Sequence, residues 1–119
     1  MLARSALALL LLAVTVLAGC SAPAPSHEAG NVVHAVADSH HGEHFEPADR
    51  AIAVGGTIRF HIDSGSHTVD FQDTDGVSSP HQQNLAPGTD VDVTFAKAGT
   101  FRYYCQYHLP GMTGTITVA

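Results

Sequence analysis

Hydrophobic and polar residues alternate along several short stretches of the chain. In residues 57–63, Ile58, Phe60 and Ile62 are separated by polar side chains, and residues 91–95 repeat the pattern. Successive side chains of a β-strand point to opposite faces, so each stretch has one apolar side and one polar side. The alternation predicts strands with one face in a core and the other in water.

The pattern predicts seven strands in all, separated by Gly, Pro, Asp and Ser, and no helical periodicity follows the N-terminal region. The predicted strands are residues 31–37, 50–54, 57–63, 67–72, 89–95, 100–105 and 113–118. Short strands at this spacing are typical of an all-β fold. We expect one domain over residues 31–119, a Greek-key β-sandwich of about seven to eight strands.

The N-terminal 19 residues are predicted to be a signal peptide. Residues 2–17 are almost wholly apolar, but a permanent transmembrane helix requires about 20 apolar residues. Leu17-Ala-Gly-Cys20 resembles the lipobox of bacterial lipoproteins, in which cleavage precedes the cysteine and lipid is attached to its thiol. The alternative is an ordinary signal cleaved after Ala22 or Ala24.

Residues 20–30 have the Pro, Ala and Ser composition of a tether. With lipid on Cys20, the domain would be held at the extracytoplasmic face of a bacterial membrane, in the periplasm or at the cell surface. Cys105 would then be the only free thiol of the mature chain. An exposed thiol is prone to oxidation in such a compartment, and metal binding is a reason to retain it.

The charge of the mature chain is acidic. Removing residues 1–19 leaves four basic and eleven acidic residues, hence a formal charge of −7. This balance excludes nucleic acid as a partner. Acidity can steer a basic redox partner, although solubility is the commoner reason for it. We expect a monomer.

Two metal-capable side chains fall on predicted inward faces. Cys105 alternates in phase with Phe101 and Tyr103, and His67 alternates in phase with Val69. A buried thiol and a buried imidazole both require partners. A metal ion between two facing strands would supply one to each of them.

The stretch Cys105-Gln-Tyr-His108-Leu-Pro-Gly-Met112 adds two further donors close to Cys105. With His67, the set is a thiolate, two imidazoles and a thioether, which suits a type 1 copper centre. The loop lies between predicted strands and resembles the C-terminal signature of the cupredoxin family. Phe45-Glu-Pro47 is similar to another segment of that family, and the chain looks plastocyanin-like or amicyanin-like.

The resemblance implies a role for each donor. Cys105 would supply the thiolate, His67 and His108 the imidazole nitrogens, and Met112 a weak axial thioether. Three residues separate His108 from Met112, whereas plastocyanin-like members usually have four and amicyanin-like members two. The spacing therefore leaves the subfamily open and makes Met112 the least secure of the four ligands.

The resemblance also implies a docking surface, because the ring edge of His108 would reach the surface among Leu109, Pro110 and Gly111. Electrons would pass to and from redox protein partners through this edge. The cofactor would be one type 1 copper per chain.

Other interpretations of the same residues remain. Each ligand by itself could be a core or turn residue, and zinc accepts a His, His and Cys set. His40, His41 and His44 could form a second metal site in a loop, although a solvated polar loop is favoured. Copper storage or delivery is therefore the alternative to electron transfer. An enzyme is rejected, because a site closed by four protein ligands leaves no position for substrate.

Overall fold

The computed structural model describes Gly19 and residues 30–119. The predicted signal peptide, the lipidation of Cys20 and nearly all of the predicted tether therefore lie outside the described residues. No helix in the described part of the chain is long and apolar enough to span a membrane.

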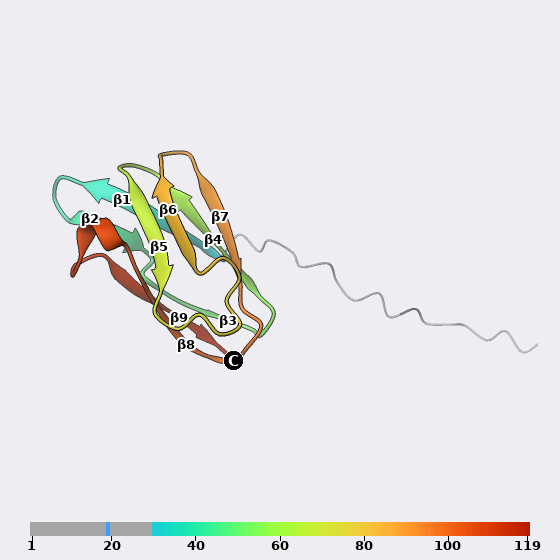
Figure 1. Cartoon of the computed structure of the whole chain (residues 1–119). Helices are drawn as coiled ribbons and strands as arrows, with labels where there is room; N and C mark the ends of the chain where they lie inside the picture. Colours follow the sequence, from blue (N-terminus) through green and yellow to red (C-terminus); the bar gives the residue numbers. More distant parts are fainter. Residues whose placement is uncertain (1–18, 20–29) are drawn as a thin grey trace, which may run out of the picture.

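The described residues form an all-β sandwich of two layers, as predicted (Figure 1). One sheet has the strand order β2-β1-β4-β7 and the other the order β3-β9-β8-β5-β6. Both sheets are mixed, because β1 pairs parallel to β4 and β3 pairs parallel to β9, while the other pairs are antiparallel. The elements in chain order are β1 (Val32–Asp38), β2 (Gly42–Glu46), β3 (Asp49–Ile52), β4 (Thr57–Ile62), β5 (His67–Phe71), β6 (His81–Leu85), β7 (Asp90–Thr94), β8 (Gly99–Tyr104), the 3₁₀ turn η1 (Gln106–His108) and β9 (Thr113–Val118).

Two strands exceed the sequence prediction and bring the described total to nine. β2 and β6 occupy segments interpreted as polar loops, so His44 and His81 lie in strands, while His40 and His41 remain in the β1–β2 turn. Both are edge strands of their sheets. An edge strand is held by backbone pairing on one side and can be polar on its exposed face, so its alternation is weak.

The predicted inward faces meet in the core. Ile58, Phe60 and Ile62 of β4 are fully buried. The ring of Tyr103 packs against Phe60 with ring centroids 5.1 Å apart, in an edge arrangement favoured by aromatic pairs. The largest apolar side chains therefore lie between the two sheets.

A close contact joins the last hairpin to the β2–β3 connection. The hydroxyl of Tyr103 donates a hydrogen bond to the carbonyl oxygen of Ala48, with the two oxygens 2.6 Å apart, and the Thr115 amide donates to the same carbonyl over 3.0 Å. Gly114 is paired with Tyr103 across the hairpin and leaves room for this hydroxyl. The contact holds β8 in register at Tyr103, two residues before Cys105.

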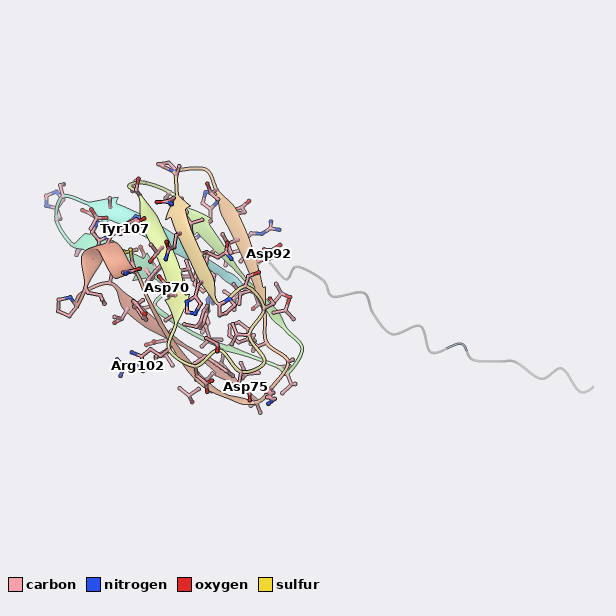
Figure 2. All side chains as sticks on the ribbon, viewed as in Figure 1. Asp70, Asp75, Asp92, Arg102 and Tyr107 are labelled. Atoms are coloured by element: carbon pink, nitrogen blue, oxygen red, sulfur yellow. The ribbon has the colours of Figure 1, made fainter. Side chains whose placement is uncertain are left out.

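Strand β5 differs from the others because all five of its residues are buried. It lies between β8 and β6. On the side away from the core, Asp70 places Oδ1 3.1 Å from Nδ1 of His81 (Asp70 is labelled in Figure 2). Because both faces of β5 are covered, the backbone of its first residue, His67, is held in a fixed position.

Candidate metal centre

Three donor atoms from three elements converge at one end of the sandwich. His67 begins β5, Cys105 directly follows β8, and His108 ends η1. The Cys105 sulfur lies 3.8 Å from Nδ1 of His67 and 3.3 Å from Nδ1 of His108. Within the described ranges, these residues form the one group of three or more His, Cys, Asp or Glu side chains whose ligand atoms all lie within 4.8 Å of one another.

The expected inward direction of Cys105 and His67 is confirmed, since both are fully buried. Alternation along β8 carries Tyr103 and then Cys105 to the core side, as the pattern predicted. His108 is partly accessible, with 27% of its side chain exposed. The site therefore has two buried donors and one donor at the surface.

Backbone hydrogen bonds fix the loop that follows Cys105. The Cys105 amide donates to the Met112 carbonyl over 3.0 Å, and the Met112 amide donates to the His108 carbonyl over 3.2 Å. The His108 amide donates to the Cys105 carbonyl over 3.3 Å. Met112 itself is fully buried. The loop thus places His108 and Met112 by backbone contacts that need no metal.

Thr68 supports the thiol from the next residue along β5. Its backbone amide donates to the Cys105 sulfur over 3.3 Å, and its hydroxyl accepts a hydrogen bond from the Gln106 amide over 2.7 Å. The sulfur therefore has a backbone donor that faces it from the neighbouring strand. Sequence reasoning missed Thr68, because a backbone donor leaves no mark in the amino-acid pattern.

A hydrogen bond at Nε2, the ring nitrogen that faces away from Cys105, sets the orientation of His67. Nε2 lies 2.7 Å from the carbonyl oxygen of Ser64 and donates a hydrogen bond to it. The proton is therefore on Nε2, and the lone pair on Nδ1 faces the Cys105 sulfur. Metal-binding imidazoles commonly have this arrangement, in which the second nitrogen donates to an acceptor outside the metal.

A carboxylate of β2 lies beside the outer nitrogens of both histidines. Glu43 Oε2 is 3.7 Å from Nε2 of His67, and Glu43 Oε1 is 3.8 Å from Nε2 of His108. Glu43 Oε2 is buried and has no hydrogen-bond partner among the described residues. Glu43 lies in β2, in a segment that the sequence pattern did not predict to be a strand.

The donor set fits copper. A buried sulfur and two imidazole nitrogens within 4.8 Å of one another, with a buried methionine later in the same loop, are the donor types of a type 1 copper site. Zinc accepts the first three of these donors, but a thioether is a ligand typical of copper. The cluster fits one type 1 copper per chain.

The second metal site considered for His40, His41 and His44 stays a hypothesis, and these residues make contacts within their own hairpin. His41 Nδ1 lies 3.1 Å from Asp38 Oδ2, and His44 Nδ1 lies 3.0 Å from the Gly42 carbonyl. The His40 amide donates to Asp38 Oδ1, which lowers the pKa of that carboxyl. In the part of the chain that the structure describes, His40, His41 and His44 form no group with ligand atoms within 4.8 Å of one another.

The predicted docking residues are at the surface next to His108. Leu109 is 54% exposed, and Pro110 and Gly111 are also exposed. Tyr107 adds a second large apolar side chain on this end of the sandwich, where Figure 2 labels it beside η1. The exposed residues that flank the accessible histidine in the chain are therefore largely apolar, while the Glu43 carboxylate lies 3.8 Å from its Nε2.

A two-layer β-sandwich with a buried thiolate and imidazole centre at one end defines a class of mononuclear copper protein. A family model described as a cupredoxin-like domain matches residues 8–118, and the chain belongs to the cupredoxin family. Its sequence and fold are plastocyanin-like and amicyanin-like.

Individual relatives agree with this assignment. The plastocyanin of Prochlorothrix hollandica is 38% identical over 81 residues, covering 62% of this chain and 62% of that protein. The purple cupredoxin of Nitrosopumilus maritimus superposes with a TM-score of 0.62 at 23% identity, over 74% of this chain and 98% of that one. A reduced amicyanin variant superposes with a TM-score of 0.58 at 26% identity, over 74% of this chain and 80% of that one. The chain thus spans less than two thirds of the length of the plastocyanin.

Proposed function

We propose that the protein carries single electrons between redox proteins outside the cytoplasm, through one copper ion held by His67, Cys105 and His108 with Met112 as a weak axial ligand. The convergence of two imidazole nitrogens on one buried sulfur supports this proposal most directly. Copper bound there supplies a couple that changes by one electron. The protein supplies the fixed positions of the donors.

Each donor is held by a contact outside the metal. Ser64 holds His67, the Thr68 amide holds the Cys105 sulfur, and the backbone bonds of the loop hold His108 and Met112. Donors fixed in this way move little when the charge at the site changes. Small movement favours fast electron transfer, because little reorganisation is required.

The electron route in this proposal uses the accessible edge of His108. Its side chain is the partly exposed one among the three donors, and the exposed residues Leu109, Pro110 and Gly111 directly follow it in the chain. An apolar rim can be desolvated at small cost when a partner docks briefly. The partner in this proposal is therefore a redox protein with a matching apolar surface. We also propose that this chain acts as a monomer.

The proposal does not include an enzyme activity, because four protein ligands would leave the metal no open position for substrate. Copper storage or delivery would require additional binding capacity. Among the described residues, His40, His41 and His44 form no group of donor atoms within 4.8 Å of one another, so we prefer the carrier proposal. Export and lipid attachment at Cys20 remain part of the proposal and rest on the sequence, and the intact mass of the mature N-terminus would test them.

Copper titration followed by voltammetry tests the function. We expect one tightly bound copper per chain, an intense thiolate-to-copper absorption and reversible one-electron cycling. Cys105→Ser should abolish the absorption. Replacing His40, His41 and His44 together by Ala should leave the copper content unchanged. Copper binding without reversible cycling would contradict the carrier, and extra copper lost with the three histidines would favour storage.

A further inference from the structure

The carboxylate of Glu43 has a position that the proposed function does not explain. It comes from β2, in the sheet opposite the one that supplies His67 and Cys105, yet its two oxygens lie 3.7 and 3.8 Å from the outer nitrogens of His67 and His108. Oε2 is buried and has no hydrogen-bond partner among the described residues. A buried carboxylate oxygen without a partner is costly, so the placement calls for a compensating role.

The local chain is shaped around this carboxylate. Gly65 adopts a φ of +78°, and a Cβ there would lie 3.0 Å from His67 Nε2 and 3.4 Å from Glu43 Oε2. A side chain at this position would be strained and would crowd both groups. The turn before β5 therefore leaves space in which Glu43 and His67 approach each other.

The outer nitrogens of the two histidines have different partners. His67 Nε2 donates to the Ser64 carbonyl, whereas His108 Nε2 faces Glu43 Oε1 at 3.8 Å, just beyond hydrogen-bond distance. An imidazole that binds a metal through Nδ1 has its proton on Nε2, and that N–H requires an acceptor facing it. Among the described residues Glu43 is the group that a small side-chain movement would bring within hydrogen-bond reach of His108.

The negative charge of Glu43 also affects the balance between the two oxidation states of copper. A thiolate with Cu(I) is neutral, whereas a thiolate with Cu(II) has one positive charge. A negative group close by and partly shielded from water interacts more favourably with the positive form. Its removal should therefore favour the reduced form.

We propose that Glu43 is a positioning residue of the copper site, which holds the His108 ring with its proton on Nε2 and lowers the reduction potential of the protein. This inference rests on the proposed function, because it presumes copper at the three-donor cluster. Glu43 would not bind the metal itself. It would act through the two histidines and through its charge.

The chain offers a matched control in Glu46. This residue has the same charge and lies three positions further along β2, but its side chain is 74% exposed and faces His44 at 3.6 Å. Glu43→Gln and Glu46→Gln change the net charge equally and keep side-chain size. Only the first removes charge beside the copper histidines.

The first experiment measures the reduction potential of the copper-loaded full chain by voltammetry. We expect a positive shift for Glu43→Gln and none for Glu46→Gln, with one copper per chain in both. Equal shifts in the two variants would mean that the reduction potential responds only to net charge, and this result would overturn the proposal. The absence of any shift in Glu43→Gln would overturn it as well.

The second experiment uses the copper-free protein and reads the protonated nitrogen of His108 from imidazole ¹⁵N chemical shifts, in conditions where the ring is neutral. We expect the Nε2–H form in the wild type and in Glu43→Gln, whose amide oxygen can still accept. In Glu43→Leu a substantial population should move to the Nδ1–H form. An unchanged distribution in Glu43→Leu would overturn the positioning role. If copper failed to bind the wild type, the proposed function would fail, whereas this second readout would remain interpretable by itself.

Discussion

The contact between Gly114, Tyr103 and Ala48 gives a sharp prediction for the substitution Gly114→Ala. A Cβ at position 114 would lie far inside van der Waals contact with the Ala48 carbonyl oxygen and with the hydroxyl and ring of Tyr103. The carbonyl is backbone and is also hydrogen-bonded to the Thr115 amide. Tyr103 is fully buried in the core, so neither neighbour can move away freely.

The expected cost has two parts. Overpacking a filled core costs about 1–3 kcal/mol. Displacing the Tyr103 hydroxyl from Ala48 adds about 1 kcal/mol for the lost hydrogen bond. The total is roughly 2–4 kcal/mol, which for a domain of this size lowers the melting temperature by roughly 10–30 °C.

Denaturant unfolding of the copper-free protein is the assay, because bound metal would add its own stabilisation. Gly111→Ala is the matched control, since a Cβ at Gly111 meets nothing within 4 Å. It should change the free energy of unfolding by less than about 0.5 kcal/mol. In a Tyr103→Phe background the hydroxyl is gone, so Gly114→Ala should cost less there than in the wild type. Equal midpoints for Gly114→Ala and Gly111→Ala would refute the packing argument.

Three further predictions concern the site and its support. Burial raises the pKa of Tyr103 above its unfolded value. The contribution of the neutral, buried Tyr103 to the free energy of unfolding is therefore fully present below about pH 10 and is lost as pH rises. Wild-type stability should then fall by roughly 1.4 kcal/mol more per pH unit above that point than the stability of Tyr103→Phe, measured by alkaline denaturation. Thr68→Val should expose the Gln106 amide to faster hydrogen exchange and cost about 1–3 kcal/mol, whereas Thr68→Ser should keep its protection. Copper at 100 times its dissociation constant should raise the free energy of unfolding by about 2.7 kcal/mol, and Cys105→Ala should remove most of this gain in thermal melts.

The sequence predicted well the strands that bury one face, for a physical reason. Strands β4, β7, β8 and β9 have one face in the core and one in water, and side-chain alternation records that difference directly. The prediction that Cys105 and His67 point inward came from the same alternation. Strands β2 and β6 were missed because each buries a single side chain, Phe45 or Leu85, so backbone pairing rather than an alternating apolar face holds most of their length.

The supporting contacts of the site could not be predicted from the pattern. The Thr68 amide and the Ser64 carbonyl are backbone groups, which every residue possesses. Glu43 is distant from the other site residues in sequence, and it approaches them because β2 lies in the opposite sheet. Donor types and spacing indicate what the site binds, whereas the way it is held depends on strand pairing between distant segments.

The hydrogen bond from the Cys105 amide to the Met112 carbonyl closes residues 105–112 into a loop whose ends are fixed to each other. Residues 109–111 lie inside this loop, are exposed and contribute none of the proposed ligands. Under the proposed function, substitutions there would alter the docking surface without disturbing strand register or the core. Recognition and folding are thus encoded by separate residues, so natural variation or protein engineering could change the partner while retaining the same redox centre.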